Sequence, residues 1–183
     1  MIAINLTAED IMQLRFAFSP ILEAVVSYHM LNKPSLHTAQ FMPWIDEANR
    51  ALQDVSLPYM DAMIAGRSYI PDFLTPTPTA PGVDFEEDLK RLYHTPLPIV
   101  EYQIKQTMMW GEESELLCHA LAHPRETIDA LVAELRLYWQ RTLEHHWARI
   151  TMIVENDVLY RARQLALYGA ADMLNGLHPQ IGY

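Results

Sequence analysis

Residues 147–173 read WARITMIVENDVLYRARQLALYGAADM, and this stretch decides the fold class. Apolar or small residues recur in it at steps of three and four. They are Trp147, Ile150, Val154, Val158, Ala162, Leu165, Gly169 and Met173. Such steps place side chains on one face of a helix, because an α-helix turns once in about 3.6 residues. The stretch therefore predicts a long C-terminal helix, over residues 145–176, with an apolar stripe along it.

Helix-start signals recur upstream of this stretch, in the form of side-chain oxygens or prolines suited to a first helical turn. They are Thr7 before Asp10, Ser19 before Pro20, Asp84 before Glu87 and Thr95 before Pro96, with Pro43, Pro58 and Pro124 in first turns. Strands have little support, since the chain has only six glycines and no clear alternating apolar run. We therefore expect an all-α, single-domain multi-helix bundle. Its further helices are predicted near residues 7–17, 20–31, 36–53 (broken at Pro43), 57–65, 84–93, 96–109, 112–122 and 124–143.

A proline-rich segment, residues 66–83, is the one long stretch without a helix signal. Its prolines favour extended backbone. Ile70, Phe73 and Leu74 within it are apolar, so we expect an ordered loop that packs on the helices. Residues 20–31 are nearly all apolar, which predicts a central helix.

Composition excludes several classes of function. The 183 residues suit one domain, and 50% of them are hydrophobic, enough for a substantial core. The net charge of −10 argues against binding to nucleic acid by this chain alone, because such binding depends on cations that displace phosphate counterions. No signal peptide or membrane-spanning run is evident. One cysteine, Cys118, allows no intramolecular disulfide, as suits a cytoplasmic protein.

No catalytic centre emerges from the motifs, and we expect no enzyme. A Gly-x-Ser-x-Gly elbow and a glycine-rich phosphate loop are both missing from the sequence. His119 and His123 have the spacing of a helical metal pair, but Cys118 points about 100° away from His119. His145 and His146 are neighbours and are predicted to face different directions. We therefore predict no metal site and no cofactor.

Two charged pairs lie beside apolar helical faces and leave two interpretations open. Arg15 and Glu23 either pair to fix the angle between the first two helices or face a ligand pocket. Asp157 and Arg161, at i and i+4, form either a simple intrahelical ion pair or part of an interior charge network.

Aromatic residues near these charges suggest where a ligand would bind, although a solid core is the competing expectation. We hypothesise a pocket between the last helix and the first two. Its candidate residues are Arg15, Glu23, Tyr28, Trp139, Trp147, Asp157 and Arg161.

The string Leu-Arg-Phe-Ala-Phe-Ser-Pro-Ile-Leu-Glu, residues 14–23, resembles the opening of one group of bacterial regulators. These are ArsR-type transcriptional regulators that carry a long helical N-terminal region of unknown function. Further matching strings cover nearly the whole chain in the same order. They are residues 69–76, 84–89, 137–139, 146–150, 155–163 and 176–181.

The resemblance implies that residues 1–183 form the helical regulatory domain of such a regulator. It also implies a DNA-binding winged helix downstream of Tyr183, through which alone DNA would be contacted. A homodimer and a small-molecule effector that shifts the helix arrangement are further expectations. The alternative is a free-standing helical protein that binds a small molecule, or an enzyme acting on an apolar substrate.

Overall fold

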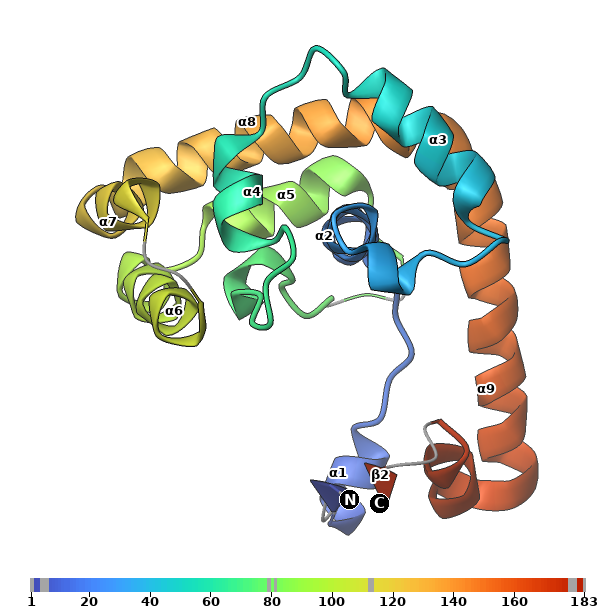
Figure 1. Ribbon diagram of the computed structural model, residues 1–183. Helices are drawn as coiled ribbons and strands as arrows, with labels where there is room; N and C mark the ends of the chain where they lie inside the picture. The colour runs from blue at the N-terminus through green and yellow to red at the C-terminus, as the bar shows by residue number, and fades with distance from the viewer. Residues whose placement is uncertain are drawn as a thin grey trace. The chain divides into compact units, whose positions relative to one another are not determined.

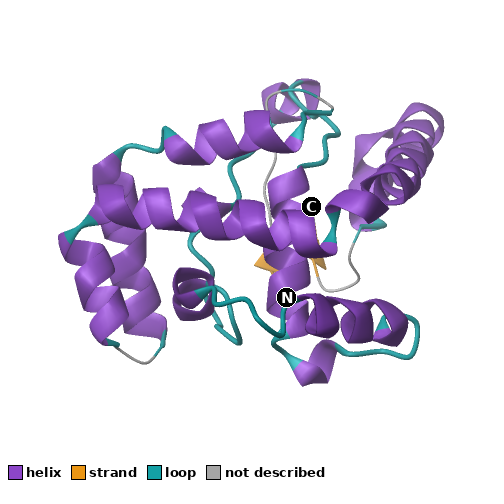
Figure 2. Ribbon diagram, turned by 90° about the horizontal axis from the view of Figure 1, so that it is seen from above, coloured by secondary structure: helices purple, strands orange, loops and turns teal. Residues whose placement is uncertain are grey.

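A computed structural model describes residues 2–3, 7–78, 80, 82–111, 114–177 and 181–182. These residues are mainly helical, with loops between the helices, which confirms the all-α prediction (Figure 2). The chain divides into two compact units. The larger unit is Ser19–His146, and the smaller unit combines Met1–Phe18 with Trp147–Tyr183.

The larger unit contains seven of the described α-helices and three short 3-10 helices (Figure 1). In chain order they are α2 (Pro20–Leu31), η1 (Pro34–Leu36), α3 (Met42–Ala51), α4 (Pro58–Met63), η2 (Asp72–Leu74), α5 (Phe85–Tyr93), α6 (Leu97–Trp110), α7 (Glu115–Ala122), α8 (Pro124–Thr142) and η3 (Glu144–His146). Ser19 and Asp84 cap α2 and α5 as predicted, each accepting a backbone N–H from the residue three positions on.

Helix α8 is the centre of this unit, because each of the helices α2 to α7 packs against it (Figure 1). Its inward face carries Ile128, Leu131, Leu135 and Tyr138, all fully buried. The predicted central helix, α2, contributes Ile21, Ala24 and Val25 to the same core, but its Leu22 and Val26 are exposed. The apolar run of residues 20–31 therefore fills part of the core and also places apolar side chains on the surface of α2.

The proline-rich segment is ordered where the structure describes it. Phe73 and Leu74, in the short helix η2, are buried. The Phe73 N–H donates to Oε1 of Gln103 on α6 at 2.7 Å. The predicted packing of this loop on the helices is confirmed.

The smaller unit contains β1 (Ile2–Ala3), α1 (Ala8–Met12), α9 (Trp147–Asn175) and β2 (Ile181–Gly182). The two short strands pair in parallel. Thr7 and Asp10 form the predicted reciprocal cap of α1. The long C-terminal helix is confirmed, but it is interrupted at Gly169, where φ is +83° and ψ is 174°.

Two predicted boundaries were wrong. The first helix ends at Met12 and not near 17, and the third, predicted over 36–53 with a break at Pro43, is α-helical only from Met42. Helix α6 starts at Leu97 after Pro96, with no side-chain cap from Thr95. Of the predicted start of α7, residues 112 and 113 lie outside the described part of the chain. No helix among the described residues has the length and apolarity needed to cross a membrane.

Candidate functional site

Helix α9 has one half-buried face and one exposed apolar face. The half-buried face carries the predicted stripe from Trp147 through Ile150, Val154 and Val158 to Leu165. Trp147 lies beside Phe18 of the same unit, with the ring centroids 6.3 Å apart. Two predicted members of the stripe, Ala162 and Gly169, are instead exposed.

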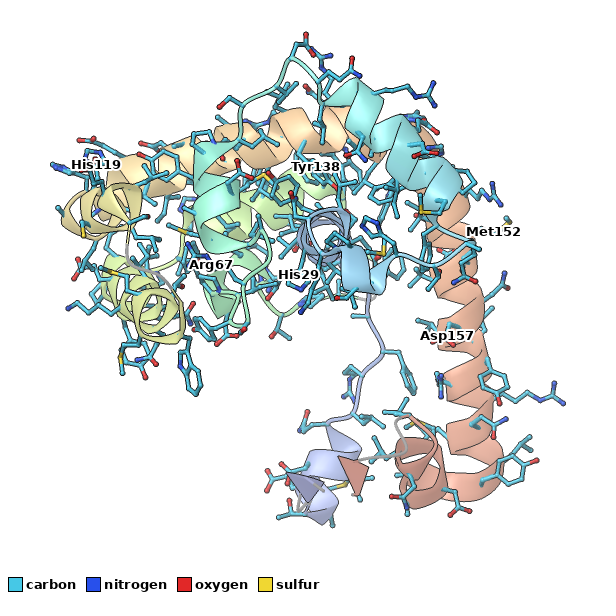
Figure 3. The ribbon with its side chains drawn as sticks, viewed as in Figure 1. His29, Arg67, His119, Tyr138, Met152 and Asp157 are labelled. Carbon is cyan, nitrogen blue, oxygen red and sulfur yellow. The ribbon has the colours of Figure 1, made fainter. Side chains whose placement is uncertain are left out.

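The opposite face of α9 displays large apolar side chains to solvent. Met152 and Ile153 are each 58% exposed, Leu159 is 67% exposed, Tyr160 is 55% exposed and Leu167 is 59% exposed. Met152 is labelled on α9 in Figure 3. Met152 lies seven residues before Leu159, and Ile153, Tyr160 and Leu167 follow one another at seven-residue spacing, so these residues form one stripe along the helix. We call it the outer face of α9.

The outer face reads nearly the same in both directions about a point between Leu159 and Tyr160. Met152 and Ile153 are matched by Leu167 and Ala166 at equal distances from that point. The exposed polar residues Asn156 and Arg163 are matched in the same way. Exposed apolar stripes of this kind commonly mark interaction surfaces.

Four of the predicted ligand residues lie in the smaller unit: Arg15, Trp147, Asp157 and Arg161. Asp157, labelled on α9 in Figure 3, forms the predicted intrahelical ion pair with Arg161, whose Nε lies 3.5 Å from Asp157 Oδ1. The Arg161 guanidinium also lies 5.6 Å from the centre of the Tyr160 ring. Arg15 is exposed and donates to the carbonyls of Met12 and Leu14, at 3.0 and 2.8 Å.

The other predicted ligand residues, Glu23, Tyr28 and Trp139, lie in the larger unit. Glu23 is half-buried, and this burial raises its carboxyl pKa. Tyr28 is a core residue that donates to Asp61 Oδ1 at 2.6 Å. Trp139 stacks on Phe85, with the centroids 4.4 Å apart. A pairing of Arg15 with Glu23, or a pocket lined from both sets, would join the two units and stays a prediction.

A hollow of about 410 Å³ lies on the larger unit beside Trp139. Its walls include Phe85, Glu86, Arg136, Trp139, Gln140 and Glu144. Arg136 donates to both carboxylate oxygens of Glu86 at 2.8 Å, which fixes the guanidinium. The Arg136 hydrogen bond also lowers the pKa of the Glu86 carboxyl. The hollow is therefore lined by charged side chains together with the aromatic rings of Phe85 and Trp139.

Several half-buried and buried polar groups of the larger unit bond to one another or to backbone, and so have structural roles. Glu134 of α8 accepts the N–H groups of Tyr59 and Met60, at 3.1 and 2.8 Å, and so caps α4. Burial raises the pKa of Glu134 despite these bonds. Burial also raises the pKa of Tyr138 to about 12. Tyr138 lies among the helices in Figure 3, bonded to Ser27 at 2.9 Å.

The histidines differ from the prediction in one respect. His145 and His146 do not face different directions, because both Nε2 atoms approach Oε1 of Glu47, at 2.8 and 3.2 Å. The hydrogen bond from His145 lowers the pKa of the Glu47 carboxyl. His119 and His123 lie close together, on α7 and at its C-terminus, with tilted rings whose centroids are 4.5 Å apart. His119 lies at the edge of the larger unit in Figure 3.

The sequence carried a signal for the outer face that the prediction overlooked. Residues 152, 153, 159, 160 and 167 follow the same helical period as the predicted stripe, on the opposite side of the helix. No comparable signal joins Glu47 to residues 145 and 146, because nearly a hundred residues separate them. No family model matches the chain, and comparison with curated proteins and solved structures found no match.

Proposed function

We propose that this chain is the dimer-forming regulatory region of an ArsR-like transcriptional regulator. Short stretches of the sequence resemble stretches of such regulators and occur in the same order, which supports the proposal that the chain is part of a regulator. The observation that carries the dimer is the outer face of α9, an exposed apolar stripe about four turns long. A second copy of the same chain is the occupant that fits this face best, for two reasons.

The first reason is that the residues of the outer face are similar at equal distances on either side of a point between Leu159 and Tyr160. Two copies of α9 packed antiparallel about a two-fold axis between Leu159 and Tyr160 would match apolar with apolar residues. Leu159 would face Tyr160 of the second copy, and Met152 would face Leu167 of the second copy. A closed two-fold contact requires a self-complementary surface of this kind.

The second reason is charge. In the antiparallel register Arg163 would lie beside Asn156 of the second copy and within reach of the exposed Glu155 next to it. A parallel register would instead place Arg163 opposite Arg163 of the second copy, where the like charges repel. The charge pattern therefore favours the antiparallel arrangement. One pair of helices that pack along about four turns makes a small interface, so we expect a dissociation constant in the range of about 1–100 µM.

Cysteine cross-linking tests the dimer and its register together. In a Cys118→Ser background, Leu159→Cys lies next to the two-fold axis and should give a disulfide-linked dimer on mild oxidation. Met152→Cys should not cross-link to itself, because Met152 would lie roughly 22 Å along the axis from its own copy. The double variant Met152→Cys, Leu167→Cys should cross-link.

The pattern of linked species separates the outcomes. Self-linking of Met152→Cys as well as of Leu159→Cys would favour a parallel pair and contradict the proposal. Equal linking of Tyr102→Cys, an equally exposed residue of α6, would mean random collision.

A sensing role has one supporting observation, the hollow beside Trp139. A fixed guanidinium, carboxylates and an indole ring suit a small polar molecule with a flat portion. Native mass spectrometry of protein isolated from its own cells tests this role. A bound mass that disappears in Arg136→Met would support a ligand there, and a bound mass that remains would place the ligand elsewhere.

A further inference from the structure

Two histidines and a glutamate from distant parts of the sequence meet at the surface of the larger unit. Glu47 lies on α3, and His145 and His146 form the end of η3. One ligand atom of each lies within 4.8 Å of the others. We propose that Glu47, His145 and His146 bind a zinc ion or a similar divalent transition metal.

The chemistry of this ligand set suits zinc. Two imidazole nitrogens and one carboxylate oxygen make a set found in zinc enzymes, with bonds of about 2.0–2.2 Å. Tetrahedral bonds of that length separate neighbouring ligand atoms by about 3.4 Å. The Nε2 atoms of His145 and His146 already lie 2.8 and 3.2 Å from Glu47 Oε1. Small rotations of the three side chains would make room for the ion. Each imidazole would bind it through an Nε2 that carries no proton.

The backbone that carries these ligands is held in place from both sides. Ile45 and Ala48 of α3 are buried, one on each side of Glu47 in sequence. Trp44 Nε1 donates to the Thr142 carbonyl at 3.4 Å and so ties α3 to the end of α8. Thr142 and Leu143, just before η3, are also buried. A site on fixed backbone needs little reorganisation when the metal binds.

The site is open to solvent on one side. The side chains of His145, His146 and Glu47 are 49%, 32% and 45% exposed. Water would therefore complete the coordination, as at zinc sites that exchange a ligand and unlike closed structural sites. The net charge of −10 favours the approach of cations. The metal would join α3 to η3 in addition to the existing contacts.

Zinc titration of the chelator-stripped chain, followed by calorimetry, tests the proposal. We expect one zinc ion per chain with a dissociation constant of about 1–10 µM. His145→Asn and Glu47→Gln should each raise that constant about tenfold or more. Cobalt in place of zinc should give the visible absorption of a four-coordinate ion, and the same variants should lose it.

His119→Asn is the matched control, because His119 and His123 also lie close together. Sedimentation at the same zinc concentrations shows whether exposed histidines of different chains are bridged. Three results would overturn the proposal: no binding at about 1 mM zinc, affinity unchanged in His145→Asn and Glu47→Gln, or affinity lost in His119→Asn. Circular dichroism of each variant confirms that these surface substitutions leave the fold intact.

Discussion

Asp88 ties two helices of the larger unit together. Its side chain is fully buried in the first turn of α5 and accepts hydrogen bonds from the Ser19 hydroxyl and from the Ile21 N–H. The first turn of α2 is thereby supplied with a carboxylate from another helix, where the helix dipole favours negative charge. Arg91 Nη1 lies 3.6 Å from the other carboxylate oxygen of Asp88.

We expect Asp88→Ala to lower the free energy of unfolding by about 2–3 kcal/mol, because buried donors lose their acceptor. Urea denaturation measures this loss. Asp84→Ala is the control, since Asp84 caps α5 from an exposed position and its loss should cost only about 1 kcal/mol. An equal loss in the two variants would mean that the buried carboxylate adds nothing beyond an ordinary cap.

Glu23 gives a prediction for the dependence of stability on pH. Burial raises the pKa of its carboxyl above the ordinary 4.5, so the folded chain holds this proton more tightly than the unfolded chain. Its contribution to folding is therefore fully present below the unfolded pKa and is lost as pH rises through the folded pKa. We expect Glu23→Gln to be more stable than the wild type at about pH 7 and equal to it near pH 4.

Urea denaturation at the two pH values measures this difference. A Gln variant that is less stable at neutral pH would contradict the expectation. It would instead favour the predicted partnership with Arg15.

At the scale of elements, Gly169 divides α9. Its φ of +83° with ψ of 174° lies in a region that glycine alone adopts readily, and a Cβ there would meet nothing within 4 Å. Gly169→Ala should therefore act through the backbone, and we expect a loss of about 1–3 kcal/mol in unfolding free energy. Undiminished stability together with a stronger helical circular dichroism signal would show instead that α9 runs straight.

Most helices could be predicted from sequence, because their signals are local. Ser19 and Asp84 cap the helices that follow them, and the apolar stripe from Trp147 marks α9. The misplaced boundaries have a different origin. Leu14, Ala17 and Phe18 are apolar and lie at helical spacing, yet Ser19 must be extended before Pro20. Pro43 can occupy only a first helical turn, so α3 cannot extend back to residue 36.

The candidate sites were harder to predict, because they depend on which elements pack together. His145 and His146 meet Glu47 only because α3 packs on the end of α8 and η3 follows directly. The ion pair of Asp157 with Arg161 was predictable, since both residues lie on one helix. Tyr28 was placed in a pocket by its proximity to charged residues, but its hydroxyl bonds Asp61 within the core.

At the scale of the whole molecule, the net charge determines whether we expect the chain to bind nucleic acid. A net charge of −10 cannot supply the cations that displace phosphate counterions. We expect no measurable binding of this chain to duplex DNA at physiological salt, measured by fluorescence anisotropy with labelled duplexes. Micromolar binding that weakens as salt increases would contradict this expectation.

Self-association through the outer face of α9 is the central claim, and sedimentation equilibrium tests it most directly. The wild-type chain should pass from monomer to dimer over about 1–100 µM. Leu159→Glu places a charge at the centre of the pair and should stay monomeric throughout, while Tyr102→Glu, on the equally exposed face of α6, should associate like the wild type. Association of Leu159→Glu with unchanged affinity, or a wild-type chain that stays monomeric at about 1 mM, would contradict the claim.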